Sequence, residues 1–429
     1  MFHPPKVRRK SDTGKRISPN TRQPIQRAVG FEVEVKNWKT YRTRPKGHPV
    51  MPWHIEREFT KGRYKHHTKD LLFKGRDYEL TADCPFAGNS VPEFITIPFE
   101  EDFDGLHRAN KAFAQIGELV DRMHHEAKIH PETLNRLDEY HAHGSVEAPT
   151  AMIDALPKPD FHPQANVGLR LTAVTDLFGL SSEKPITTPV AERLTRIKSL
   201  RGQPQRRERR SMAQAREKAE RALDKFRYVF TIHEDWTPSE ELLNLLAYML
   251  HYIECPMINY HEYPKSFFPI MARTDFFMMY RLLPFEEQDY FSENDGNMFV
   301  KLFEMIKHSL PDIGELELDE EFFEEGIRND QEADNYRLDG LTRKEWIRGV
   351  ATGKDLLTSR NFPDQNINRE LQTMGSWQKY DDLEAGGRAM PILELRRLQF
   401  TDNTEDLRAM AVEIFRTIIH LNEKHQPED

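Results

Sequence analysis

Residues 30–38 read GFEVEVKNW, and apolar and polar side chains alternate strictly from Phe31 to Lys36. Successive side chains of a β-strand point to opposite faces, so this spacing predicts a strand with one apolar and one acidic face. Glu32 and Glu34 would share the acidic face. Like charges side by side on a sheet are destabilising unless something neutralises them, and this marks the strand as a candidate site.

Four further stretches have the character of strands: 77–82 (DYELTA), 92–98 (PEFITIP), 164–173 (QANVGLRLTA) and 391–400 (PILELRRLQF). They are scattered along the chain, with helical patterns between them. This order is typical of an α+β protein with an antiparallel sheet, and does not fit regular βαβ repeats.

The helical patterns have recognisable starts. Residues 105–127 repeat apolar side chains at helical spacing, with Asp104 available as the N-cap. Thr237 and Thr342 each open a capping box, the first with proline at the first helical position. Residues 404–423 form a last amphipathic pattern. We expect these helices to cover one side of the sheet.

The net charge of −9 is unevenly distributed over the 429 residues. Residues 1–27 hold eight Lys/Arg against one Asp, residues 191–228 thirteen Lys/Arg against five Asp/Glu, and residues 311–334 eleven Asp/Glu against one Arg. Such blocks are usually solvated; otherwise they meet each other or a charged partner. We expect a disordered basic arm at 1–27 and one domain at 28–429, with charged insertions at 175–226 and 311–389.

The composition also limits the class of protein. No stretch approaches 18 uncharged apolar residues, and the basic N-terminal stretch lacks the apolar run of a secretory signal. We therefore expect no membrane span. Cys84 and Cys255 are the only cysteines, which favours a reducing, cytoplasmic compartment over a disulfide scaffold. The net charge disfavours a dedicated nucleic-acid binder.

The polar faces of the other strands extend the candidate site. Gln164, Asn166 and Arg170 would share one face, as would Glu394 and Arg396, while Glu93 begins a strand and Asp83 ends the one before it. One wet face is ordinary for a single antiparallel strand. Several carboxylates with arginines nearby suit Mg²⁺ and the phosphates of a nucleotide.

Arg273 and Arg281 lie eight residues apart on an expected helix. Eight residues are a little over two helical turns, so both could face one cleft. The alternative is a pair of salt-bridged surface arginines.

The strand GFEVEV resembles the opening G-x-E-x-E strand of amidoligases with a glutamine-synthetase-like fold, a family that includes the glutamate–cysteine ligases. The P-E-x-x-T-x-P strand at 92–98 and the E-L-R at 394–396 are similar to later family strands. Many amidoligases carry H-x-H-x-G where this chain has Q-A-N-V-G at 164–168, a pattern similar to that of plant-type glutamate–cysteine ligases. The resemblance covers about 28–173 and 237–400.

The resemblance implies a curved antiparallel sheet and ATP-dependent formation of an amide bond through an acyl phosphate. It assigns Mg²⁺ to Glu32, Glu34 and Glu93, with Glu394 as an additional candidate. It assigns the phosphoryl group to Arg396 and Arg170, with Asp83 in the catalytic set, and the nucleotide or a metal-bound water to Gln164 and Asn166. Arg273 and Arg281 are further candidates for binding the nucleotide, on their spacing alone.

Several functions stay open at this point. The acceptor amine is either a small molecule or a lysine of another protein, as in toxins of this fold that cross-link host proteins, and such an effector would act in a host cytosol. The alternative is a non-catalytic binding protein that keeps the fold and docks an acidic partner through 204–227. Nucleic-acid binding through 1–27 and 204–227 is a third hypothesis.

Overall fold

The computed structural model describes residues 28–42, 51–52, 70–83, 91–126, 144–146, 151–180, 206–230, 236–254, 270–307, 318, 342–353, 390–396, 398 and 400–426. The expected arm at 1–27, both cysteines and most of 311–389 lie outside these residues.

The described strands are β1 (Ala28–Val35), β2 (Lys39–Arg42), β3 (Met51–Pro52), β4 (Asp70–Gly75), β5 (Tyr78–Asp83), β6 (Val91–Thr96), β7 (Phe99–Glu100), β8 (Gly144–Val146), β9 (Ala151–Asp154), β10 (Phe161–Gly168), β11 (Ile270–Ala272) and β12 (Ile392–Leu395). The α-helices are α2 (Phe103–Glu126), α3 (Val174–Leu180), α5 (Arg206–Phe230), α6 (Glu240–Glu254), α8 (Phe276–Tyr280), α9 (Phe285–Lys307), α10 (Arg343–Thr352) and α12 (Thr404–Lys424).

Within the described part of the chain, nine strands form one sheet in the order β11-β12-β10-β1-β6-β5-β4-β8, with β7 beside β1. Each of these pairs is antiparallel. A separate three-stranded sheet has the order β3-β2-β9. The predicted α+β class with an antiparallel sheet is therefore confirmed, and the five predicted strands are β1, β5, β6, β10 and β12.

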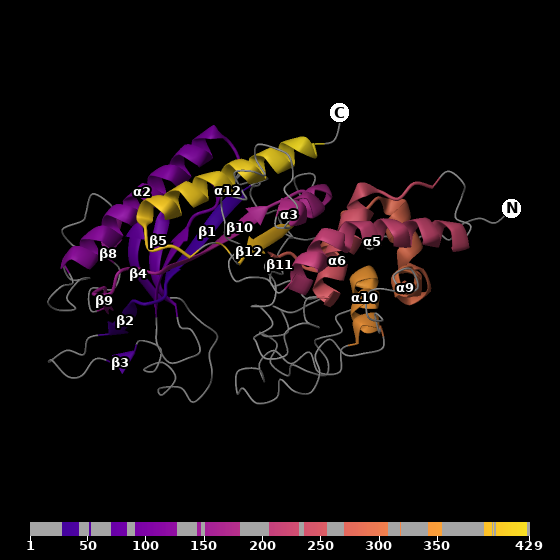
Figure 1. Ribbon diagram of the computed structural model, residues 1–429, viewed down its shortest axis with the longest axis horizontal. Helices are drawn as coiled ribbons and strands as arrows, with labels where there is room; N and C mark the ends of the chain where they lie inside the picture. Colours follow the sequence, from indigo (N-terminus) through magenta and orange to yellow (C-terminus); the bar gives the residue numbers. More distant parts are fainter. Residues whose placement is uncertain are drawn as a thin grey trace, which may run out of the picture.

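The apolar face of β1 lies under helices. Phe31 is buried and meets Phe113 of α2 edge to face, with 5.1 Å between ring centroids. Helices α2 and α12 lie side by side over this face (Figure 1). They approach closely, because a Cβ on Gly117 would lie 3.2 Å from Cβ of Thr404. The acidic residues of β1 consequently point to the opposite face.

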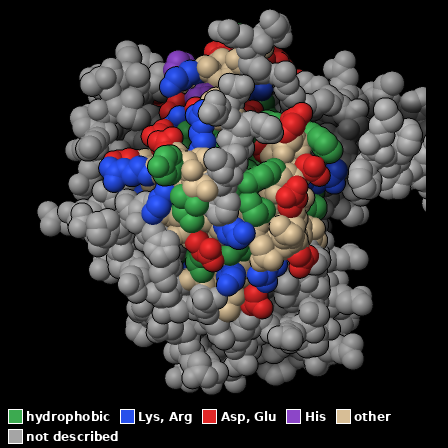
Figure 2. Space-filling model, turned by 90° about the vertical axis from the view of Figure 1, so that its right-hand side faces the viewer, with side chains coloured by type: hydrophobic (Ala, Val, Ile, Leu, Met, Phe, Trp, Pro, Cys, Tyr) green, Lys and Arg blue, Asp and Glu red, His purple; other side chains and the backbone are tan. Residues whose placement is uncertain are grey.

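The remaining helices form a group beyond the β11 end of the sheet (Figure 1). Helix α5 packs on α6 and α9 through a buried stripe of Ala215, Ala219 and Ala222. Both expected insertions contribute buried side chains, since Trp346 of α10 is also 1% exposed. On the outer surface of this group, acidic, basic and apolar side chains of described residues are interspersed (Figure 2).

The structure corrects two of the three expected helix starts. The amide of Gly105 donates to Oδ1 of Asp102 at 2.6 Å, so α2 is capped by Asp102 and not by Asp104. Only glycine fits at position 105, because a Cβ would lie 1.9 Å from the carbonyl oxygen of Glu100. The capping box of Thr342 with Glu345 is confirmed.

The N-cap of α6 lies two residues after the expected N-cap, Thr237. Oγ of Ser239 accepts from the amide of Leu242 at 3.1 Å, so Ser239 is the N-cap. A capping box would use a glutamate three residues on to accept the N-cap amide. Here Glu287 of α9 does so, accepting from the amide of Ser239 at 2.8 Å and from its hydroxyl at 2.5 Å.

Candidate functional site on the polar sheet face

Strand pairing brings most of the predicted site residues onto one face. The strands β12, β10, β1 and β6 are neighbours in this order. Residues directly opposite each other in antiparallel strands project to the same face, with Cβ atoms about 5 Å apart. The register places three such pairs along the face: Glu34 with Glu93, Glu32 with Gln164, and Asn166 with Glu394. This is the face opposite to α2 and α12.

The acidic part of this face lies on β1 and β6. Glu34 is directly opposite Glu93, which is 2% exposed, and Lys36 forms an ion pair with Glu34. Nδ2 of Asn166 donates to Oε1 of Glu32 at 3.0 Å. Lys36 thus neutralises the charge of Glu34, and the amide of Asn166 provides a hydrogen bond to Glu32.

The basic part lies on β11 and β12, around a fully buried carboxylate. Glu394 is 0% exposed; its Oε2 lies 2.8 Å from Nε of Arg273, and Nη1 of Arg396 donates to both of its oxygens at 3.1 and 3.2 Å. A buried carboxylate needs such partners, since an isolated charge is costly to bury. The two guanidiniums are thereby held together at one end of the face.

The spacing between the strands separates the predicted metal ligands into two groups. Strands β12 and β6 are three strand spacings apart, roughly 14 Å at about 4.8 Å each. Oxygen ligands of one Mg²⁺ lie about 2.1 Å from it, so two of them are at most about 4 Å apart. Both oxygens of Glu394 are engaged by arginine. The prediction of Glu394 as a metal ligand is therefore replaced by a role as an anchor for Arg273 and Arg396.

The structure does not place Arg170 and Arg281 with the other predicted site residues. Strand β10 ends at Gly168, so the alternation that would place Arg170 on the polar face stops before it. Its Nε donates to the carbonyl oxygen of Asn422 in α12 at 3.2 Å, toward the helix side. Arg281 is the C-cap of α8 and is exposed. It shares no helix with Arg273, because Asp275 begins α8 after Arg273.

Asp83 ends β5, where it pairs with Val91 of β6. Its side chain lies outside the described part of the structure. Its predicted catalytic role stays a prediction.

His162 is a residue of this face that the sequence analysis missed. It lies directly opposite Glu34, its Nε2 is 3.2 Å from Oδ2 of Asp160, and its ring stacks on Phe400 with centroids 3.7 Å apart. The predicted strand began at Gln164, whereas β10 begins at Phe161. Extending the alternation two residues back from Gln164 would have placed the histidine on the polar face.

The donor chemistry of Glu32, Glu34 and Glu93 suits a hard cation such as Mg²⁺, which takes oxygen ligands. Among the residues that the structure describes, no three His, Cys, Asp or Glu side chains are already arranged to hold a metal ion. The carboxylates would have to exchange their present partners, Lys36 and Asn166, for a bound cation.

Comparison with known proteins adds no assignment: no protein-family model, no curated protein and no solved structure matches the chain. None of the helices in the described ranges has the length and apolar character needed to cross a membrane.

Proposed function

We propose that the protein is an ATP-dependent ligase that joins a carboxylate to an amine on a glutamine-synthetase-like sheet. One observation carries the proposal: strand pairing and two ion pairs place carboxylates, amides and a guanidinium pair in sequence across one face of five neighbouring strands. Phosphoryl transfer depends on positioning and on neutralising phosphate charge, and these residue types provide both.

Each group has a defined task in the proposed reaction. Arg273 and Arg396 bind oxygens of the transferred phosphoryl group, and the amides of Gln164 and Asn166 donate to the phosphate chain. Mg²⁺ on Glu32, Glu34 and Glu93 would supply charge neutralisation for the phosphates. The substrate carboxylate attacks the γ-phosphorus and releases ADP. The amine then attacks the acyl phosphate, losing a proton, and releases inorganic phosphate.

Hydroxylamine tests this reaction without knowledge of the amine, since it traps an acyl phosphate as a hydroxamate. Amino acids, dicarboxylates and carboxylate-bearing proteins would be incubated with ATP, Mg²⁺ and hydroxylamine, and hydroxamate and ADP measured. We expect equimolar ADP and hydroxamate with at least one carboxylate. Arg396→Ala should lower the rate by about 10²-fold or more, as for loss of one preorganised charge at a transition state.

Arg416→Ala is the matched control. Arg416 lies on α12, on the far side of the sheet, with its guanidinium 3.4 Å from Glu413. This variant should keep the wild-type rate. Formation of ADP by wild type and Arg396→Ala at equal rates would contradict the assignment. A protein acceptor, as for a cross-linking effector, would appear as a covalent adduct formed without hydroxylamine.

A non-catalytic binding protein on the same sheet is the second candidate. The ion pair of Lys36 with Glu34 and the hydrogen bond from Asn166 to Glu32 favour it, because they give these two carboxylates partners within the protein without a metal. Binding of ATP with no ADP formed in the presence of any carboxylate and hydroxylamine would support this candidate over the ligase.

A further inference from the structure

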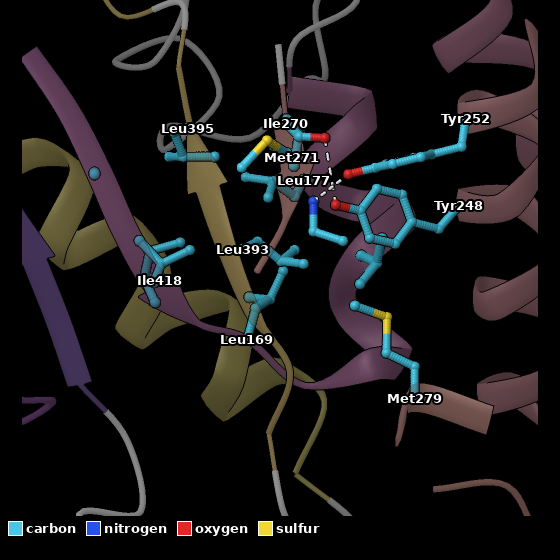
Figure 3. Close-up of a cluster of buried hydrophobic side chains, with 14 of the residues drawn as sticks. Leu169, Leu177, Tyr248, Tyr252, Ile270, Met271, Met279, Leu393, Leu395 and Ile418 are labelled. Carbon is cyan, nitrogen blue, oxygen red and sulfur yellow. Dashed lines mark hydrogen bonds between the residues drawn. The ribbon is translucent and has the colours of Figure 1, made fainter. Parts of the chain in front are cut away.

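Strand β11 lies at the end of the sheet order, and its two sides have different partners. On one side Met271 pairs with Glu394, and the amide of Arg273 donates to the carbonyl oxygen of Ile392 at 2.9 Å. On the other side the partners are two side chains of α6 (Figure 3). The amide of Ala272 donates to the hydroxyl of Tyr252 at 2.5 Å, and the hydroxyl of Tyr248 donates to the carbonyl oxygen of Ile270 at 3.3 Å.

The two tyrosines are rigidly placed. Tyr248 and Tyr252 are 0% and 1% exposed, and their rings meet edge to face with centroids 5.3 Å apart. Both also contact Phe276, at 5.1 and 4.8 Å. An edge strand presents unpaired backbone groups, and buried tyrosine hydroxyls need partners. The tyrosines of α6 therefore bond the side of β11 that β12 leaves open.

This contact lies one residue from the candidate site. Arg273 directly follows Ala272, and its guanidinium lies 2.8 Å from Glu394. A backbone bound on both sides cannot shift without breaking a hydrogen bond, so the start of the Arg273 side chain has a fixed position. We propose that Tyr252 is a positioning residue for Arg273, through which the helical group sets the guanidinium pair of the sheet face. The use of this pair for ATP phosphates rests on the proposed function.

The variant Tyr252→Phe removes the hydroxyl and keeps the buried ring. We expect faster amide hydrogen exchange in peptides covering 270–274 and about tenfold weaker ATP binding with Mg²⁺ present. Tyr248→Phe is the matched control, because it removes the longer bond, two residues further from Arg273. It should change ATP affinity by less than about threefold.

A double-mutant cycle with Arg273→Gln separates positioning from general structural damage. If Tyr252 acts through Arg273, adding Tyr252→Phe to Arg273→Gln should weaken ATP binding by less than about twofold. A full additional tenfold loss would overturn the proposal. So would unchanged exchange at 270–274 in the single variant.

Failure of the proposed function would be visible separately, as wild type that does not bind ATP at all. In that case the same double-mutant cycle is measured as the unfolding free energies of the variants, together with amide hydrogen exchange at 270–274. Non-additive stabilities of the two variants would support the positioning role, and additive stabilities with unchanged exchange would overturn it.

Discussion

Asn422 of α12 lies where this helix meets the end of β10 and the turn before α2, and its side chain is fully buried. Its Nδ2 donates to the carbonyl oxygen of Gly168 at 3.0 Å and to Oε2 of Glu101 at 2.7 Å. Its Oδ1 accepts from the amide of Arg170 at 2.8 Å. One amide thus links a helix, a strand and a loop that are distant in sequence.

Asn422→Ala should therefore destabilise the fold strongly. It leaves these groups without their partner, and each buried polar group left unsatisfied costs about 1–3 kcal/mol. We expect a loss of about 3 kcal/mol or more in the free energy of unfolding, measured by chemical denaturation. Asn403→Ala removes an exposed N-cap of the same helix and should cost only about 1 kcal/mol. Equal losses in the two variants would contradict the role of Asn422.

Glu287, which caps α6 from α9, gives a pH-dependent prediction. Burial raises the pKa of this carboxyl above its ordinary value, although its hydrogen bonds to Ser239 oppose the shift. A carboxyl whose pKa is raised by folding contributes most to stability at a pH below its unfolded pKa. This contribution is lost as pH rises through its folded-state pKa. Glu287→Gln removes the charge and keeps an acceptor for Ser239.

The stability of Glu287→Gln relative to wild type should consequently improve between pH 4 and pH 8. Denaturation midpoints measured across this range would check it. Glu423→Gln is the control, because Glu423 is an exposed glutamate on α12. If the difference in stability between wild type and Glu287→Gln does not change with pH, the buried charge is not its cause.

Among the elements, strands were predicted where alternation is local and unbroken. Strand β1 alternates over its whole length, and its burial pattern follows the sequence. Strand β4 was missed because its register shifts between Leu71 and Phe73, which interrupts the period of two. Strand β11 has only three residues, all buried, so no alternation marks it.

Contacts between elements were less predictable, for a physical reason. The N-cap of α6 depends on Glu287, 48 residues away, which no local pattern reveals. The site shows both cases. The shared face of Glu32 and Glu34 followed from local alternation, whereas their pairing with Glu93 and Gln164 depends on register between distant strands. Arg273 was assigned to a helix because the short strand before it carries no signal.

The junction of α3 with α12 provides a prediction at this scale. Oδ2 of Asp176 in α3 lies 2.9 Å from Nε2 of His425 and 2.5 Å from Nζ of Lys424. The hydrogen bond from His425, aided by Lys424, lowers the pKa of Asp176 to about 2. A depressed pKa contributes stability that is present above the unfolded value near 3.8 and is lost as pH falls toward 2.

Asp176→Asn should thus lower the unfolding free energy by about 1 kcal/mol at pH 6, a small value because the pair is partly solvated. The difference from wild type should shrink as pH falls from 4 to 2, as followed by thermal unfolding. Asp224→Asn, an exposed aspartate on α5, is the control. A deficit that persists unchanged at pH 2 would show that the ion pair is not its source.

In the whole molecule, the sheet contacts two groups of helices with different roles (Figure 1). Helices α2 and α12 cover its apolar face, and the helical group beyond β11 binds its edge through α6 (Figure 1). The polar face opposite α2 and α12 has an acidic part, on β1 and β6, and a basic part, at β11 and β12, that the helical group positions. The proposed ligand would extend across both parts, since no single ion can span them.

This division predicts different effects of variants in the two parts on ATP binding, measured by calorimetry with and without Mg²⁺. Glu34→Gln should abolish most of the gain in affinity that Mg²⁺ gives, and leave Mg²⁺-free binding within about twofold. Arg396→Gln should weaken binding about tenfold under both conditions, because a hydrogen bond to a charged group contributes a net of about 1.5–3 kcal/mol. Glu79→Gln on β5, whose carboxylate lies 3.6 Å from Lys74, is the matched control and should bind as wild type. If Glu34→Gln and Arg396→Gln have the same dependence on Mg²⁺, the two parts do not act separately, and the cation must be placed elsewhere on the face.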